Sequence, residues 1–294
     1  MPVDSDLYPS RTGDAEQIIS RADPIIHGNG AEVGPYSLDA EQLSFFETNG
    51  FIVLERYLED IVTPLLSELD RICEYKESPE LFTEPESKAV RSIFDVPRFS
   101  HIALELARHP KMLDIAEQIL GSPVYLHQSR FNIKPAHEGR SFSWHSDFET
   151  WHTEDGLPRC RCVTGWIMLT ENTPYNGPLF IIPGSHRHYV SCGGITPEDH
   201  YRASLRKQIL GSPSRTTIRR LAEHSRITGV YGPPGTVVFH EGNIMHGSPD
   251  NISPWPRSNL FFVYNSVENP PSKPFGATRR RPAFLANPDT TPLR

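Results

Sequence analysis

Hydrophobic and polar positions change their spacing close to Gly121. Before that residue, apolar side chains recur every three or four positions, which is typical of helices with one buried face. The spacing predicts helices over residues 37–50, 60–76 and 101–121. Ser37 is the expected N-cap of the first helix, Gly50 is its expected stop, and Pro110 interrupts the third. The first third of the chain is therefore mainly helical, apart from a strand expected after Gly50.

After Gly121 the apolar runs become short or alternating, and Gly, Pro and Asn separate them. Such runs are typical of β-strands joined by turns, and they predict strands over 123–134, 161–170, 177–184, 235–242 and 258–267. One helical insert is expected over 196–210. Because strands do not alternate with helices, a doubly wound sheet is disfavoured. The predicted fold class is mainly β with helices, a jelly roll with an N-terminal helical layer.

Residues 1–36 differ from the rest because they are polar, rich in Asp, Gly and Pro, and without periodicity. They are expected to form an arm that lies on the surface or is disordered, and no catalytic residue is expected there. Residues 37–294 are expected to form a single domain, since a chain of 294 residues with 37% hydrophobic content can bury a sizeable core. The sequence leaves open whether the arm closes over a pocket.

The charge balance narrows the class of partner. A formal charge of −7, from 29 basic and 36 acidic residues, provides no broad positive surface for a nucleic acid. No apolar run reaches the roughly 20 residues of a membrane span, and the first residues lack the order of a secretory signal. The four cysteines form no CxxC pair, so reduced thiols and a cytoplasmic location are expected. The oligomeric state is open, with a homodimer as one alternative.

The densest candidate chemistry is "WHSDFETWHTEDGLP", residues 144–158. His145 and Asp147 are two positions apart, so on an extended strand both side chains would point to the same face. His246 follows the strand expected over 235–242 and precedes a turn. Two histidines and one carboxylate are the ligand set of non-haem Fe(II) oxygenases. In a chain with 13 histidines, however, an HxD match alone also fits an ordinary polar loop.

Arg257 strengthens the metal interpretation. It lies eleven residues after His246, on the next expected strand, where its guanidinium could clamp a carboxylate of an anionic co-substrate in bidentate fashion. The alternative is a surface salt bridge, which contributes only about 0 to 1 kcal/mol and needs no special position. A zinc hydrolase with the same three ligands and a non-catalytic binding protein also remain open at this point.

Longer strings resemble a known family. They are "WHSDFETWHTEDGLP", "VYLHQSRFNIKP", "YNGPLFIIPGSH", "TPEDHY", "MHGSPDNISPWPRSN" and "VYNSVENPPSKPFG". From about residue 6 to the C-terminus the chain is similar to the ectoine hydroxylases, members of the phytanoyl-CoA dioxygenase superfamily. The resemblance implies a cupin-like double-stranded β-helix and a hydroxylase that uses Fe(II), 2-oxoglutarate and O2. The substrate it implies is a small cyclic zwitterion, with conversion of ectoine to 5-hydroxyectoine and release of succinate and CO2.

The same resemblance assigns residues. It implies iron ligands at His145, Asp147 and His246. It implies that 2-oxoglutarate is held by Arg257, Lys134, Asn132, Phe94 and Ser248. It implies substrate contacts at Gln128, Trp151, Pro197 and Phe261. A hydrogen-bonding amide and aromatic walls suit a cyclic zwitterion, although aromatic residues of a β-fold are also ordinary core. The nearby acidic residues are expected to fix the loop or orient a ligand rather than catalyse, and they are Glu149, Glu154 and Asp155.

Two positions depart from the family pattern. Where ectoine hydroxylases read like "ALSMSIALTEN", this chain reads "CVTGWIMLTEN", so the bulky Trp166 replaces a small hydroxyl residue. Where the family has "FDCN", this chain has "HEGN", so His240 replaces a phenylalanine near the iron ligands. Both residues are candidate substrate contacts, with a surface-facing position as the alternative for His240. They keep open a hydroxylase of proline, pipecolate, another cyclic amino acid or a biosynthetic intermediate.

Overall fold

Two antiparallel sheets form the centre of the molecule. The computed structural model describes residues 6–11, 13, 15–74, 78–205, 208–223 and 225–294. The larger sheet has the strand order β2 (Phe51–Leu54), β11 (Val237–Glu241), β7 (Cys162–Met168), β13 (Arg257–Ser266), β5 (Val124–Lys134), β4 (Val90–Phe94) and β3 (Leu81–Thr83). The smaller sheet has the order β10 (Thr228–Val230), β8 (Leu179–Ile181), β12 (His246–Ser248) and β6 (Phe142–His145). The two sheets confirm the predicted jelly-roll, cupin-like class.

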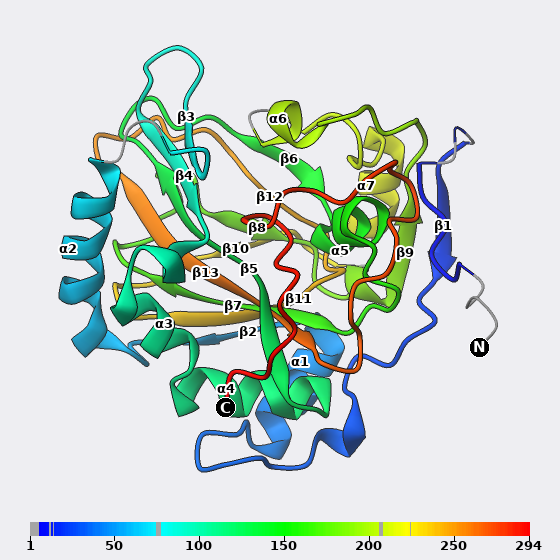
Figure 1. Cartoon of the computed structure of the whole chain (residues 1–294), viewed down its shortest axis with the longest axis horizontal. Coiled ribbons are helices and arrows are strands. Elements are labelled where there is room, and N and C mark those ends of the chain that lie inside the picture. Colours follow the sequence, from blue (N-terminus) through cyan, green and yellow to red (C-terminus); the bar gives the residue numbers. More distant parts are fainter. Residues whose placement is uncertain (1–5, 12, 14, 75–77, 206–207, 224) are drawn as a thin grey trace.

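A helical layer covers one face of the larger sheet (Figure 1). It consists of α1 (Ala40–Asn49), α2 (Val62–Cys73), α3 (His101–Ala107) and α4 (Pro110–Leu120). The helices pack on alternate strand residues such as Ile167, Phe239 and Phe262, which belong to the same buried cluster. Apolar packing of this kind is the dominant stabilising contribution in such a layer. The N-terminal helical layer predicted from the spacing is therefore confirmed.

The first helix begins at a different cap from the one expected. Asp39 accepts a hydrogen bond from the backbone of Gln42, and the Gln42 side chain accepts one from the Asp39 backbone, which completes a capping box. Ser37, the expected cap, instead accepts hydrogen bonds from Val33 and Gly34 and closes the preceding turn. The predicted stop is correct, since Gly50 adopts the left-handed conformation, with φ of 79°.

The opposite face of the larger sheet points toward the smaller sheet. Trp166 and Met168 of β7 and Phe261 of β13 lie on this inner face, packed against Leu179 and Ile181 of β8. Neighbouring residues of the same strands face the helices, as the alternation of a half-buried strand requires. The inner face therefore combines an apolar base with the polar residues described below.

The arm differs from the prediction. Its strand β1 (Gln17–Ser20) pairs antiparallel with β9 (His188–Ser191). Tyr8 is fully buried and donates a hydrogen bond to Asp23 over 2.7 Å, and Arg11 is 3% exposed. A surface position is therefore wrong for these residues. The polar composition was misleading because the buried polar groups are neutralised by partners in distant parts of the chain.

The helical insert is also only partly as predicted. Over 196–210 the described residues contain the single short helix α6 (Tyr201–Ser204), and residues 206–207 lie outside the described part. A helix that the spacing did not predict, α7 (Arg215–Ala222), follows after Ser214, whose hydroxyl caps it by accepting from Thr217. The remaining helical segments are α5 (Asp147–Thr150), a π-helical turn (Trp151–Asp155), and 3-10 turns at Gly28–Gly30, Glu59–Ile61, Val96–Arg98 and Ser185–Arg187.

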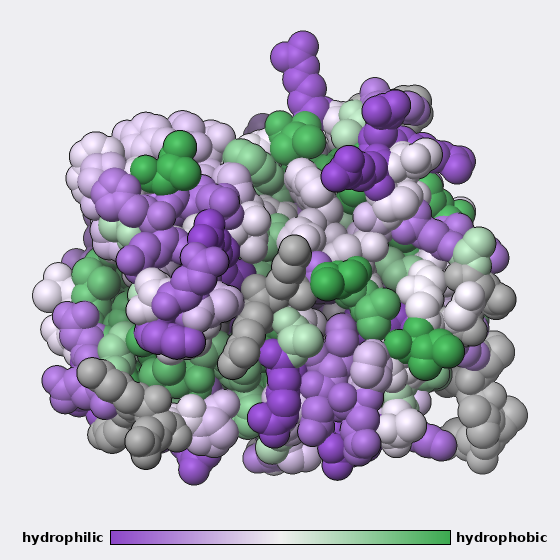
Figure 2. Space-filling model, turned by 90° about the horizontal axis from the view of Figure 1, so that it is seen from above, coloured by the Kyte–Doolittle hydropathy of each residue, from purple (hydrophilic) through white to green (hydrophobic). Residues whose placement is uncertain are grey.

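The face of the molecule seen in Figure 2 carries both hydrophobic and hydrophilic residues. Figure 2 shows hydrophobic side chains scattered among polar ones on this face. Within the described residues, no helix combines the length and apolar character needed to cross a membrane.

Candidate active site

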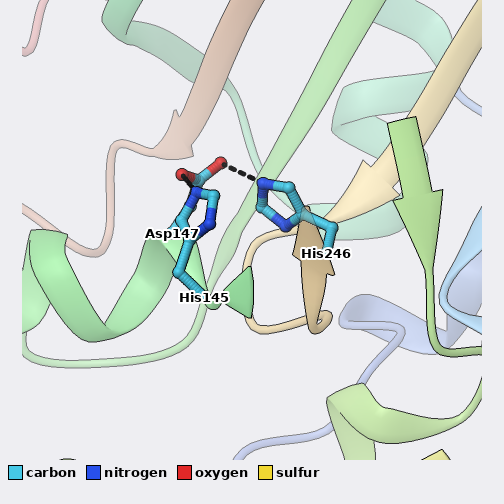
Figure 3. Close-up of side chains that lie close together, drawn as sticks. All are labelled: His145, Asp147 and His246. Carbon is cyan, nitrogen blue, oxygen red and sulfur yellow. Dashed lines mark ion pairs between the residues drawn. The ribbon is translucent and has the colours of Figure 1, made fainter. Parts of the chain in front are cut away.

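Three candidate metal ligands meet where β6 and β12 pair (Figure 3). His145 is the last residue of β6 and lies directly opposite His246, the first residue of β12. Asp147 does not lie on a strand, as the HxD interpretation assumed, because Ser146 caps a helix and Asp147 is the first residue of α5. The turn after Ser146 nevertheless brings the Asp147 carboxylate over the two imidazoles.

The distances leave room for one ion among the three side chains. The Nε2 atom of His145 lies 3.5 Å from Asp147 Oδ1, and Nε2 of His246 lies 3.8 Å from Asp147 Oδ2. One ligand atom from each residue lies within 4.8 Å of the others. The two histidine side chains are buried, and the Asp147 side chain is 13% exposed.

The histidine tautomers suit metal binding. Nδ1 of His145 lies 2.7 Å from the Ser143 carbonyl, and Nδ1 of His246 lies 3.0 Å from the Ile244 carbonyl. Because a carbonyl only accepts, both Nδ1 atoms must donate, and each Nε2 lone pair is left facing Asp147. Such hydrogen bonds orient metal-ligating imidazoles in proteins.

The charges also fit an ion. Burial raises the pKa of Asp147, but the neighbouring imidazoles of His246, His145 and His240 outweigh it, so this pKa lies well below its usual value. Burial and the neighbouring His145 hold the pKa of His246 well below its usual range. A carboxylate and neutral imidazoles are the protonation states that a divalent metal needs. The donor set fits Fe(II), which favours two histidines and one carboxylate with open positions.

A second cluster could hold an anion. Arg257 is 1% exposed, donates to Asn132 Oδ1 over 2.7 Å, and lies 3.1 Å from the Asn259 amide oxygen when that amide faces it. No carboxylate within the described ranges lies at ion-pair distance from it, and its Nε has no hydrogen-bond partner. Burial, with repulsion from Arg130 and Arg91, lowers the pKa of Arg257 to about 9. A buried cation without a counter-ion is costly unless a ligand supplies the negative charge.

Lys134 adds a second basic side chain to this cluster. It pairs with Arg257 across β5 and β13, and its Nζ donates to the carbonyls of Arg140 and Pro249, both over 2.7 Å. Burial and the charge of Arg257 lower the pKa of Lys134 to about 6. A buried arginine beside a buried lysine whose pKa it lowers forms a site suited to a carboxylate.

The remaining two co-substrate candidates lie nearby but separately. Ser248 ends β12 and directly precedes Pro249, whose carbonyl accepts from Lys134. Phe94 ends β4, opposite Arg130 of β5, and packs with Leu285 from the C-terminal segment. The structure therefore brings Arg257, Asn132 and Lys134 into one cluster, with Ser248 beside it and Phe94 one strand further along the sheet.

Phe261 and Trp166 form a stack on the inner face. Their ring centroids are 5.0 Å apart with an interplanar angle of 17°, and the guanidinium of Arg130 lies 5.1 Å from the Phe261 centroid. Because β13 lies between β7 and β5, Trp166 and Arg130 cover opposite faces of Phe261. Only the edge of the Phe261 ring is left for a ligand. The bulky Trp166 thus narrows the pocket and fixes Phe261.

His240 faces the metal ligands rather than solvent. Its Nε2 lies 3.9 Å from Asp147 Oδ2, and its ring lies 5.2 Å from that of His246. The side chain is 1% exposed, and neither ring nitrogen has a hydrogen-bond partner in the described structure. A surface-facing His240 is therefore wrong, and its free nitrogens are available to a ligand.

The other substrate candidates lie in different surroundings. Trp151 is buried in a cluster with Tyr8, and His127 meets its ring edge-on at 5.9 Å. Gln128 donates from Nε2 to the Leu285 carbonyl over 2.7 Å, which leaves its amide oxygen for a donor. Pro197 lines a small cavity with Glu154, away from the metal ligands. These three residues are not brought into one cluster.

Sequence reasoning missed Arg130. Its guanidinium forms no hydrogen bond or ion pair with the described residues, and burial lowers its pKa. A signal was present in "QSRFNIK", where polar Gln128, Arg130, Asn132 and Lys134 alternate with Phe131 and other outward residues. Strand periodicity places these four polar side chains on the inner face.

Comparisons with known proteins agree with this geometry. Residues 46–259 match the family model of phytanoyl-CoA dioxygenase (PhyH). An ectoine dioxygenase of Bordetella bronchiseptica is 47% identical over 285 residues, which cover 96% of this chain and 92% of that protein. EctD from S. alaskensis has been solved with 2-oxoglutarate and 5-hydroxyectoine (TM-score 0.87, 40% identity, 98% of this chain and 96% of that one). It has also been solved with bound Fe (TM-score 0.86, 39% identity, 99% and 98%).

These matches confirm the resemblance drawn from the sequence strings, and they support an iron oxygenase over a zinc hydrolase or a non-catalytic protein. The fold, the three ligands and the buried cations are consistent with that result. The chain belongs to the phytanoyl-CoA dioxygenase family.

Proposed function

We propose that this protein is an Fe(II)- and 2-oxoglutarate-dependent dioxygenase that hydroxylates ectoine to 5-hydroxyectoine. The observation that carries the proposal is the pairing of two unlike sites on one inner face. One is a buried His145–Asp147–His246 cluster suited to iron, and the other is a buried Arg257–Lys134 pair suited to a carboxylate. Ectoine dioxygenases that share 42–47% identity over nearly the whole chain support the choice of substrate.

The residues divide into distinct roles. His145, Asp147 and His246 hold the iron, and Arg257 with Asn132 binds the far carboxylate of 2-oxoglutarate in a forked arrangement. Lys134 adds charge, while Ser248 and Phe94 border the same site. The bound iron supplies the oxidative chemistry, in which 2-oxoglutarate and O2 give succinate, CO2 and a hydroxylated substrate carbon. The protein contributes orientation and exclusion of water.

The substrate side offers complementary groups for a cyclic zwitterion. The unpaired guanidinium of Arg130 suits the carboxylate of ectoine, and the free amide oxygen of Gln128 suits an N–H of its amidinium. Trp151 and the edge of Phe261 provide apolar walls. Pro197 lines a separate small cavity with Glu154 and is connected to the site only through the neighbouring residues of its segment. The cost of burying Arg130 without a counter-ion makes an anionic substrate group the natural partner.

A second candidate is hydroxylation of a different cyclic amino acid, such as proline or pipecolate, or of a biosynthetic intermediate. His240 favours a different substrate because both of its buried ring nitrogens, beside Asp147, lack hydrogen-bond partners. A substrate without a group that bonds to them would leave these nitrogens unsatisfied. Trp166 favours it as well because its indole fills space next to Phe261.

Aerobic incubation with Fe(II), 2-oxoglutarate and ascorbate tests both candidates. Ectoine, L-proline and L-pipecolate are supplied separately, and succinate and a product heavier by one oxygen are measured. Dominant hydroxyectoine supports the first candidate, and selective oxidation of another ring supports the second. Equal succinate formation by wild type and by His145→Ala would contradict the iron assignment in either case.

The cellular setting is proposed on chemical grounds. The reaction needs reduced iron and a central metabolic keto acid, and all four cysteines are free thiols. A cytoplasmic location agrees with both requirements.

A further inference from the structure

An arginine of the N-terminal arm lies inside the molecule behind the metal-bearing helix. Arg11 donates from Nε to Glu149 Oε1 over 2.9 Å and from NH2 to Glu149 Oε2 over 2.7 Å. Its NH1 forms an ion pair with Glu154, and Ser10 donates to Glu149 over 2.6 Å. The Arg11 side chain is 0% exposed and those of Glu149 and Glu154 are 1% and 3% exposed. A single arginine therefore pairs with two buried carboxylates.

The π-helical turn explains why one arginine reaches both glutamates. Glu149 lies in α5, and Glu154 lies five residues later in the turn Trp151–Asp155. In a π-helix the repeat is wider than in an α-helix, so residues five apart come to the same side. The same short stretch carries Asp147 at its start and Trp151 in its middle. Trp151 lies between the two glutamates, so its position depends on how this stretch is held, whereas Asp147 precedes both glutamates and is also contacted by His145 and His246.

The network also reaches the segment that contains Pro197. Glu154 accepts a hydrogen bond from His200 over 3.0 Å, and burial, which raises the pKa of Glu154, is outweighed by His200 and Arg11, which hold it at about 2. At Gly211 a Cβ atom would collide with the Arg11 guanidinium and the Glu149 carboxylate. The residues around His200 and around Gly211 thus both contact the Arg11 network.

The backbone conformation of Arg11 indicates that the surrounding structure holds its side chain against the two glutamates. Arg11 has a φ of 49°, in the left-handed region, which is strained for a non-glycine residue. Its N–H donates to the Cys192 carbonyl over 2.7 Å, which holds the residue in this conformation. Strained conformations persist where the surrounding contacts over-determine them.

We propose that Arg11 is a positioning residue of the active site, which locks the stretch that carries Trp151 to the residues around His200 and Gly211 and so holds Trp151 in place on the substrate side. The proposal rests on the hydroxylase function proposed for the protein and deepens it. Without Arg11, the carboxylates of Glu149 and Glu154 repel each other on either side of Trp151, and the residues around His200 and Gly211 lose a support. Arg257 and Lys134 lie on β13 and β5, outside this network. The effect therefore falls on the substrate and not on 2-oxoglutarate.

Arg294 provides a matched control. It also bridges two carboxylates of one helix, with NH2 2.7 Å from Asp114 and Nε 2.9 Å from Glu117. Its partners belong to α4 in the helical layer, on the far side of the larger sheet from the inner face. Arg294→Gln therefore disturbs a terminal ion network of similar composition without touching the site.

The experiment compares Arg11→Gln, Arg11→Lys and Arg294→Gln. For Arg11→Gln we expect the KM for the hydroxylated substrate to rise at least tenfold, while the KM for the keto acid co-substrate stays within twofold. Arg11→Lys should recover part of the loss, since one ammonium pairs with only one glutamate at a time. Arg294→Gln should lower the melting temperature and leave both KM values unchanged. An equal rise of both KM values in Arg11→Gln, or no rise of either, overturns the proposal.

A second measurement works without turnover. Backbone hydrogen exchange of iron-free protein over residues 196–205 should become faster in Arg11→Gln and stay unchanged in Arg294→Gln. If Arg11→Gln fails to fold, Glu154→Gln, which keeps the pairing of Arg11 with Glu149, should show the same acceleration. Unchanged exchange overturns the proposal even if ectoine proves to be the wrong substrate, and faster exchange upholds it in that case.

Discussion

Two groups of buried carboxylates lie within eleven residues, 145–155, and they are neutralised in opposite ways. Asp147 meets only imidazoles at ion-pair distance in the described structure, those of His145, His240 and His246. The carboxylates that follow all meet guanidinium groups: Glu149 and Glu154 pair with Arg11, and Asp155 pairs with Arg281. A carboxylate that meets only imidazoles can still bind a metal ion, whereas one paired with arginine already has a counter-charge. The contrast separates the metal ligand from its structural neighbours.

The arginines also divide into those that are paired with a carboxylate and those that are not. Arg281 forms a two-pronged contact with Asp155 at 2.7 and 2.6 Å. Arg257 is buried and Arg130 is partly buried, but within the described residues neither has a carboxylate at ion-pair distance. Charged groups without a counter-charge are thus concentrated at the inner face. A metal ion, a keto acid and a zwitterionic substrate supply the missing charges there. The paired charges hold the surrounding helix and segments in place.

Replacing the unpaired carboxylate should have the largest effect. Asp147→Asn removes the only negative ligand, so iron affinity and turnover should fall by more than about 100-fold, the upper range for changes that only touch a ligand's hydrogen-bond partners. Iron binding measured by equilibrium dialysis and succinate formation test this. Full iron retention in Asp147→Asn would contradict the assignment.

Replacing a paired carboxylate should affect stability instead. Asp155→Asn weakens the contact with Arg281 and the hydrogen bond with His127, so the free energy of unfolding should fall by about 3 to 5 kcal/mol. Iron affinity per folded molecule should stay unchanged. Denaturant unfolding and iron titration of one preparation check both parts. Loss of iron without loss of stability would place Asp155 among the metal ligands and contradict its structural role.

Arginines with and without a carboxylate should respond differently. Arg257→Gln should weaken 2-oxoglutarate binding by about 2 kcal/mol, roughly 30-fold, at the lower end for a buried charged contact because Lys134 remains. Arg281→Gln should lower the melting temperature and leave 2-oxoglutarate affinity unaltered. Calorimetric titration of both variants decides the matter, and equal affinities in the two would remove the proposed role of Arg257.

Local patterns in the sequence were sufficient for much of the fold. Alternation placed β5, β7, β11 and β13, and helical spacing placed the layer before Gly121. The HxD spacing and His246 indicated three residues that the structure brings together, although Asp147 proved to start a helix rather than extend a strand. These features depend on a few neighbouring residues, which a sequence pattern can reveal.

Features built from distant contacts could not be predicted in this way. Arg11 and Glu149 are 138 residues apart, and nothing in the composition of the arm distinguishes a buried arginine from an exposed one. Helix α7 was missed because its residues are strongly polar and only the cap at Ser214 marks its start. Burial of such groups follows from their partners and not from their own polarity.

The smallest expected effect is a pH dependence of 2-oxoglutarate affinity that arises from protonation of the Lys134 amine. Burial and the charges of Arg257 and Arg91 lower its pKa to about 6, so at pH 7.5 the amine of the free protein is mostly neutral. A bound dicarboxylate supplies negative charge and raises this pKa, so binding takes up a proton. Affinity for 2-oxoglutarate should therefore fall as the pH rises above about 6, by at most tenfold per unit, until the pKa of the complex is passed.

Calorimetric titration of metal-loaded protein in two buffers with different ionisation enthalpies measures that proton. At pH 7.5 the uptake should approach one proton per 2-oxoglutarate in wild type and vanish in Lys134→Met. The variant should bind more weakly at pH 6.5 and show a flatter pH dependence up to pH 8.5. Uptake that persists in Lys134→Met would assign the proton to another group. Absence of uptake in wild type would mean that Lys134 is already charged before the co-substrate binds, as a cation with a partner would be.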